Sequence, residues 1–167
     1  MEKDNSTKLI RSGLKRTEFM ETSEPLFLTS GFVYNSAEEA EDAFKEQKKR
    51  FMYSRFGNPT VQMLQDKLAD IEGAEVCWCT STGMAAVFTI FMSFLKKGDR
   101  VVAGRALFGS CHHIITKILP RFGIEVELID GKDLNAWEKA LKKRTSLIFF
   151  ETPSNPCLEI IDIKEVS

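Results

Sequence analysis

The chain has 167 residues, of which 43% are hydrophobic and 28% are charged, and its formal net charge is −1. This composition is ordinary for a globular protein, and the length predicts one domain, or one domain with an arm. The near-neutral charge gives no electrostatic reason to expect nucleic acid or an anionic membrane as a partner.

No segment has the properties of a membrane span or a secretion signal. The longest apolar run, residues 84–95, is shorter than the roughly 20 residues that a spanning helix needs. The polar N-terminal residues 1–5 precede no apolar signal region. We therefore expect a cytoplasmic protein that does not enter the membrane.

The cysteines do not suggest a metal or redox centre. Cys77 and Cys79 are two apart on a strand-like run, so they do not form a C-x-x-C pair. His112 and His113 lie next to Cys111, but no second ligand pair follows at zinc spacing. We expect buried thiols, ordinary histidines and no bound metal.

Residues 1–52 lack a regular alternation of strands and helices, and we interpret them as an N-terminal arm with one helix. Apolar positions at helical spacing predict a charged amphipathic helix over residues 38–50. Ser36 is a plausible N-cap, and Glu39 would complete a capping box. The arm is expected to pack on another part of the protein rather than to fold alone.

From residue 53 the pattern changes to strands alternating with longer helices. This alternation predicts an α/β fold with a mainly parallel sheet flanked by helices. Gly73 is expected to end the first of these helices. The apolar segment 147–150 is expected to be a strand covered on both faces. The expected helices are 61–71, 82–95, 109–120 and 134–143, and the expected strands are 75–80, 100–103, 124–129 and 146–150.

Ligands of open α/β sheets bind beyond the carboxyl ends of the strands, and several polar segments follow strands here. Thr82, Gly83 and Met84 stand at the start of an apolar helix, where free backbone N–H groups favour a phosphate. The alternative is a plain N-cap, which residue type alone favours. The glycine motifs of dinucleotide and nucleoside-triphosphate sites are absent.

Three further side chains are candidates for holding a phosphorylated ring. Tyr53 and Arg55 alternate on a segment expected to be extended, so they could grip a phosphate together; packing and a surface ion pair are the alternative. Phe108 precedes a helix and could stack on a heterocycle, although the residue type alone favours a core phenylalanine. Asn155 lies in a proline-stiffened turn and could donate to a ring oxygen or simply serve the turn. The sequence does not decide whether the prolines are cis or trans.

Together these segments resemble the cystathionine γ-synthase family, also called the Cys/Met metabolism family of pyridoxal-phosphate enzymes. The resemblance runs in order through nearly the whole chain, and the N-terminal run 16–30 is similar to the sulfhydrylase members. The matching segments are 53–60 (YSRFGNPT), 81–86 (STGMAA), 108–110 (FGS) and 151–156 (ETPSNP).

The resemblance implies a pyridoxal 5′-phosphate cofactor and a role for each matched residue. Gly83 and Met84 would donate backbone N–H groups to its phosphate, and Thr82 stands where a serine is common. Phe108 would stack on the pyridine ring, and Asn155 would hydrogen-bond the phenolic oxygen of the ring.

The resemblance also implies an oligomer. Tyr53 and Arg55 would reach the phosphate in the neighbouring subunit, with Ser54 in the same cofactor-binding segment, so a homodimer or homotetramer is expected. The implied fold is the aspartate-aminotransferase-like type I fold. Residues 1–52 would be its arm and residues 53–167 the first part of its large domain.

The activity that the resemblance implies is a γ-replacement on a small amino-acid substrate. It would form homocysteine from O-succinylhomoserine or O-acetylhomoserine and sulfide, in methionine biosynthesis. Phe108 replaces a common tyrosine and its phenolic acid, which favours sulfhydrylation over γ-lyase chemistry. Cystathionine γ-synthase and methionine γ-lyase activities remain alternatives.

No catalytic residue is assigned within the chain. The family's Schiff-base lysine, and the residues that pair the pyridine nitrogen and the substrate carboxylate, are expected beyond Ser167. The chain is therefore expected to be the N-terminal part of an enzyme, and a catalytically inactive fragment is the alternative. An unrelated nucleotide-binding module is disfavoured by the missing phosphate-loop motifs.

Overall fold

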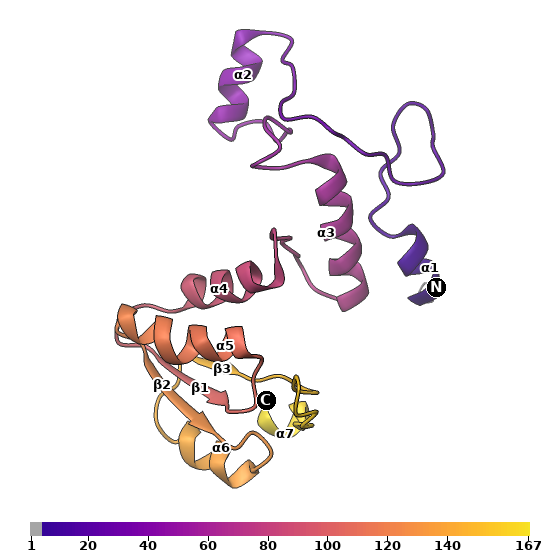
Figure 1. Ribbon diagram of the computed structural model, residues 1–167. Helices are drawn as coiled ribbons and strands as arrows, with labels where there is room; N and C mark the ends of the chain where they lie inside the picture. The colour runs from indigo at the N-terminus through magenta and orange to yellow at the C-terminus, as the bar shows by residue number, and fades with distance from the viewer. Residues whose placement is uncertain (1–4) are drawn as a thin grey trace. The chain divides into compact units, whose positions relative to one another are not determined.

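The computed structural model describes residues 5–167, and the polar residues 1–4 lie outside the described part. Contacts divide the chain into two compact units, residues 1–79 and 80–167. The expected domain boundary between residues 52 and 53 stays a prediction. The first unit contains α1 (Asn5–Arg11), α2 (Ala37–Phe44) and α3 (Pro59–Glu72) (Figure 1).

The second unit alternates helices and strands, as the sequence predicted. Its elements are α4 (Gly83–Phe94), β1 (Arg100–Gly104), α5 (Gly109–His113), β2 (Glu125–Ile129), α6 (Leu134–Leu141), β3 (Leu147–Phe149) and α7 (Ile163–Val166). Between α5 and β2 the chain continues as a π-helical turn, Ile114–Ile118, and a 3₁₀ turn, Leu119–Phe122. The expected helix 109–120 is therefore helical throughout but only partly α.

Helix α2 is shorter than the predicted 38–50. The Glu39 N–H donates to Ser36 Oγ at 3.1 Å, so Ser36 is the N-cap. The Glu39 carboxylate accepts from the Asn35 N–H at 2.8 Å, one residue before the position of a standard capping box. The helix ends at Phe44 because residues 45–50 are all charged or polar and have no apolar side chain to bury.

Helix α1 was not expected, so the described part of the arm holds two helices rather than one. It lies against α3, where Lys8 Nζ is 3.4 Å from a carboxylate oxygen of Asp70. Gly13 follows it at φ +72°, and a Cβ there would lie 2.3 Å from the Met63 carbonyl oxygen. Only glycine permits this close approach of the two backbones.

Helix α3 begins and ends where local signals predict. The Asn58 side chain caps it by accepting from the Thr60 N–H at 2.9 Å, and Pro59 occupies its first position. Gly73 ends it in the left-handed conformation, at φ 66°. The predicted stop at Gly73 is confirmed.

The sheet of the second unit is parallel, with the order β2-β1-β3. Central strand β1 is buried along its whole length, whereas β3 is an edge strand with Ile148 36% exposed. The expectation that 147–150 is covered on both faces is confirmed in part: Leu147 and Phe149 pack on the core of one face and Phe150 on the core of the other, but Ile148 is 36% exposed. The expected strand 75–80 is wrong, since that segment pairs with no strand in residues 5–167.

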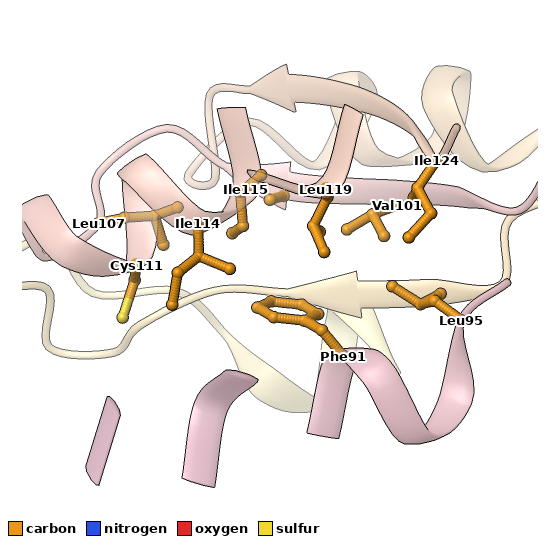
Figure 2. Packing of buried hydrophobic residues seen from close by; sticks show 10 residues of the cluster. Phe91, Leu95, Val101, Leu107, Cys111, Ile114, Ile115, Leu119 and Ile124 are labelled. Carbon is orange, nitrogen blue, oxygen red and sulfur yellow. The ribbon is translucent and has the colours of Figure 1, made fainter. Parts of the chain in front are cut away.

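Alternate residues of β1 contribute to two separate cores. Val101 and Ala103 pack with residues of α4 and of the helical segment 109–122. Figure 2 shows Phe91 of α4 and Leu95, the residue that follows α4, facing Val101 and the side chains of that segment. Val102 packs on the opposite face with Trp137 of α6 and with α7. Helices therefore cover both faces of the sheet.

Candidate functional site at the carboxyl edge of the sheet

The candidate residues of the second unit follow its strands. Helices α4 and α5 begin on the side toward which β1 points, and residues 151–162 lie on the same side after β3 (Figure 1). This is the edge at which open parallel sheets bind ligands. The predicted residues Thr82, Phe108 and Asn155 all belong to these segments.

The start of α4 presents free backbone donors. Thr82 Oγ1 caps the helix by accepting from the Ala85 N–H at 3.0 Å, and its carbonyl accepts from the Ala86 N–H. Within residues 5–167 no protein atom accepts a hydrogen bond from the N–H groups of Gly83 and Met84. A Cβ at Gly83 would meet nothing within 4 Å, and Gly83 is exposed, so the start of the helix is uncrowded at this residue. An anion fits this arrangement.

Phe108 is not a core residue. Its side chain is 44% exposed and it immediately precedes α5. Its backbone N–H donates to Glu151 Oε1 at 2.9 Å, across 43 positions of sequence. The ring is therefore available to a planar ligand while its backbone is held in place.

Asn155 lies exposed in a tightly fixed turn. The peptide bonds Thr152–Pro153 and Asn155–Pro156 are both cis. Ser154 is 1% exposed, and its N–H donates to the Glu159 carbonyl at 3.0 Å while its Oγ accepts from the Glu159 N–H at 3.0 Å. Thr152 Oγ1 accepts from the Ile161 N–H at 2.9 Å. Asn155 hydrogen-bonds through its backbone N–H, and its amide side chain bonds to no other residue in the described chain.

Glu151 was not assigned a function from the sequence. Its second carboxylate oxygen accepts from the Asn155 N–H at 3.4 Å, so one carboxylate contacts the backbones of both Phe108 and Asn155. Burial, and secondarily the negative charge of Glu151, raises the pKa of the Cys111 thiol on α5. The only sequence signal for Glu151 was an acidic residue directly after an apolar strand.

Tyr53, Ser54 and Arg55 belong to the first unit. Tyr53 forms a single bridge with Gly31, and the chain then turns, with the Phe56 N–H donating to the Tyr53 carbonyl at 2.8 Å. The expected extended conformation of residues 53–55 is therefore wrong. The turn still brings the Arg55 guanidinium carbon to 5.2 Å from the Tyr53 ring centroid.

The side chains of Arg55 and Ser54 differ in whether they already have ion-pair or hydrogen-bond partners within the described chain. Among the described residues no carboxylate pairs with Arg55, so the surface ion pair considered above is not present there. The Ser54 hydroxyl donates to the Thr29 carbonyl and accepts from Asn58 Nδ2 at 2.9 Å. Ser54 thus holds the turn, and its contact with a cofactor stays a prediction.

Of the four cysteines, Cys111 is buried, Cys77 and Cys79 are partly buried and Cys157 is exposed, so the expectation of buried thiols is confirmed for Cys111 alone. Burial, and then the neighbouring Cys77, raises the pKa of the Cys79 thiol. In the part of the chain that the structure describes, no three His, Cys, Asp or Glu side chains gather as a metal site. No described helix is both long and apolar enough to cross a membrane.

The fold and this edge define an α/β protein of the type I pyridoxal-phosphate enzyme architecture. A putative O-acetylhomoserine (thiol)-lyase from Campylobacter jejuni superposes with a TM-score of 0.89 at 29% identity, over 99% of this chain and 41% of that one. That structure contains N'-pyridoxyl-lysine-5'-monophosphate at its position 205. Cystathionine γ-synthase from Xanthomonas oryzae pv. oryzae gives 0.88 at 27% identity, over 99% of this chain and 41% of that one.

The chain belongs to the Cys/Met metabolism PLP-dependent enzyme family, whose model matches residues 6–167. It is 48% identical to O-succinylhomoserine sulfhydrylase of Mycobacterium tuberculosis, over 95% of this chain and 39% of that protein. It is 35% identical to L-methionine gamma-lyase of Treponema denticola, over 97% of this chain and 40% of that protein. The chain thus spans about two fifths of the length of these relatives.

Proposed function

We propose that this chain is the cofactor-binding N-terminal portion of a pyridoxal-phosphate transferase. The reaction is the formation of homocysteine from O-succinylhomoserine or O-acetylhomoserine and sulfide. The observation that carries the proposal is the open start of α4, at the same sheet edge as Phe108 and Asn155. The 48% identity to a sulfhydrylase favours this reaction over others in the family.

The residues present suit the phosphate and the ring of the cofactor. The N–H groups of Gly83 and Met84 bind the phosphate, because the positive end of the α4 dipole stabilises an anion there. The exposed Phe108 ring stacks on the pyridine ring. The unpaired Asn155 amide donates to the phenolic oxygen. When bound, pyridoxal phosphate supplies an electron sink for carbanion chemistry on the amino-acid substrate.

The arm serves the same cofactor in a second copy of the protein. Arg55 has no acidic partner among the described residues and lies against Tyr53, so the pair offers a guanidinium and a phenol to a phosphate. We propose that they complete the site of a neighbouring subunit in a homodimer or homotetramer. In a single copy of the chain the pair is exposed to solvent.

We assign covalent attachment of the cofactor to none of the described lysines. All of them except Lys8 and Lys67 are exposed to solvent. Lys8 is paired with Asp70 and Lys67 with Glu24, so each amine is held in an ion pair and is not directed at a ligand site. By itself the 167-residue chain then binds the cofactor without a covalent bond and does not turn over.

A comparison of two polypeptides tests the proposal. The purified 167-residue chain and the product of the reading frame continued past Ser167 are each incubated with pyridoxal phosphate. Borohydride reduction followed by peptide mapping detects a lysine adduct, and homocysteine formation measures turnover. We expect both in the longer product and neither in the chain alone. Stoichiometric adduct and turnover in the 167-residue chain, or neither in the longer product, would contradict it.

The assay also separates the two reactions of the family. Phe108 lacks the phenolic acid that a tyrosine would offer at that position, which favours replacement over elimination. We expect homocysteine to form from an acylated homoserine and sulfide faster than methionine is cleaved. Faster release of methanethiol from methionine would instead support the γ-lyase, to which the chain is 35% identical.

A further inference from the structure

We propose that Glu151 is a positioning residue that fixes Phe108 and Asn155 relative to each other. The geometry of the contact needs no cofactor. Its use in orienting a pyridine ring rests on the proposed function. Glu151 itself is not placed in contact with the ring.

The carboxylate of Glu151 divides its two oxygens between two segments of the chain. Oε1 accepts from the Phe108 N–H at 2.9 Å, and Oε2 accepts from the Asn155 N–H at 3.4 Å. Phe108 ends the loop after β1, and Asn155 lies in the turn after β3. A single side chain therefore ties together the two loops that carry the proposed ring contacts.

A charged acceptor suits the Phe108 N–H in particular. Phe108 is the residue before α5, and no side chain of its own caps that helix. The N–H groups at a helix start lack acceptors within the helix, and a carboxylate is favoured near them. Hydrogen bonds to ionised acceptors are also roughly twice as strong as neutral ones. Glu151 therefore fixes the backbone from which the Phe108 ring projects.

The turn around Asn155 does not depend on Glu151 for its shape. Ser154 makes paired hydrogen bonds with the backbone of Glu159, and Thr152 Oγ1 accepts from Ile161. These contacts close the turn on itself. What Glu151 adds is the connection between this turn and the loop of Phe108.

Two substitutions separate the oxygens of the carboxylate. Glu151→Ala removes both acceptors. Glu151→Gln keeps one acceptor oxygen but replaces the other with an NH₂ donor, which cannot accept from a backbone N–H. Since the contact to Phe108 is the shorter one, we expect glutamine to retain it and to lose the contact to Asn155. Glu138→Gln, on the exposed face of α6, is the matched control.

The first test uses the 167-residue chain without cofactor and measures amide hydrogen exchange by NMR. In Glu151→Ala we expect the Phe108 and Asn155 amides to exchange at least about tenfold faster, as the loss of a charge-assisted hydrogen bond implies. In Glu151→Gln only the Asn155 amide should exchange faster, and the Phe108 amide should stay protected. The amides of Glu159 and Ile161 should not change in either variant. Unchanged exchange at Phe108 and Asn155, or a general loss of protection, would overturn the proposal.

The second test uses the longer product and its bound cofactor. We expect Glu151→Ala to weaken pyridoxal-phosphate binding about tenfold and to reduce the induced circular dichroism of the cofactor band, with partial rescue by Glu151→Gln. Glu138→Gln should match the unsubstituted protein. Equal signals in all variants would refute the ring-orienting role. If the unsubstituted product binds no cofactor, the proposed function fails, while the exchange result still decides the contact.

Discussion

Thr82 illustrates at the scale of one residue how a cap and a binding site coexist. Its hydroxyl accepts from the Ala85 N–H, which leaves the donors of Gly83 and Met84 directed outward. The two interpretations weighed from the sequence, a plain N-cap and a phosphate site, are therefore compatible. The hydroxyl stabilises the helix, and the two uncapped N–H groups remain for an anion.

Replacing Thr82 should reveal how much the N-cap contributes to the free energy of unfolding, separately from any binding of an anion. We expect Thr82→Ala to lower the free energy of unfolding by about 1 kcal/mol, because the Ala85 N–H loses its acceptor. Thr82→Ser keeps a hydroxyl and should cost much less. Urea denaturation of the chain without cofactor measures both. An alanine variant as stable as the serine variant would show that the hydroxyl contributes nothing to the helix.

At the scale of elements, the arm is attached to α3 by ion pairs. Lys15 Nζ lies 2.9 Å from a carboxylate oxygen of Asp66, and Gln62 Nε2 donates to the other at 2.6 Å. The hydrogen bond from Lys15 is the main cause that lowers the pKa of Asp66 below its ordinary value of 3.8, and burial opposes it. This contact binds the segment after α1 to a helix far along the chain.

The sign of the Asp66 shift predicts a pH dependence. A carboxyl with a lowered pKa in the folded state stabilises the fold above its unfolded pKa, and this contribution is lost as the pH falls through the folded pKa. The unfolding midpoint should therefore drop on acidification below 3.8 more in the unsubstituted chain than in Asp66→Asn. Thermal melts at several pH values test this, with Asp42→Asn as an exposed control. Parallel pH profiles for Asp66→Asn and the unsubstituted chain would contradict it.

For the same elements, local sequence patterns predicted some features of the structure correctly and others wrongly. The cap at Ser36 and the stop at Gly73 were predictable because both signals depend on residues within one turn. The turn after Tyr53 was not predictable from the sequence. Alternating side chains suggest an extended backbone whether or not a neighbouring strand is present to pair with it. Residues 75–80 have strand composition but no neighbouring strand among residues 5–167.

At the scale of the whole chain, the larger core lies on one face of the sheet of the second unit. Phe91 is completely buried there (Figure 2). Its ring centroid is 5.0 Å from that of Phe149 on β3. Through this contact α4, which starts the proposed phosphate site, packs on the strand that leads to Glu151. Packing of α4 and β3 thus positions both parts of the candidate site.

Truncation of Phe91 should destabilise this unit strongly. We expect Phe91→Ala to cost about 3–5 kcal/mol, because it leaves a cavity between α4 and the sheet. Phe94 lies on the exposed side of the same helix, so Phe94→Ala should change the free energy of unfolding by less than about 0.5 kcal/mol. Chemical denaturation followed by circular dichroism compares the two. Equal losses for both would mean that Phe91 is not a core residue.

The sequence by itself determined the parallel α/β class, the N-cap at Ser36 and the end of α3 at Gly73, because apolar periodicity, caps and glycine stops are local properties. The residues of the proposed cofactor site came from the resemblance to a family and stay predictions. The tertiary structure decided the strand order β2-β1-β3, the edge position of β3 and the contacts of Glu151 with Phe108 and Asn155. These depend on pairing between segments distant in sequence. The energy of such a pairing comes from both partners, and neither segment encodes it alone.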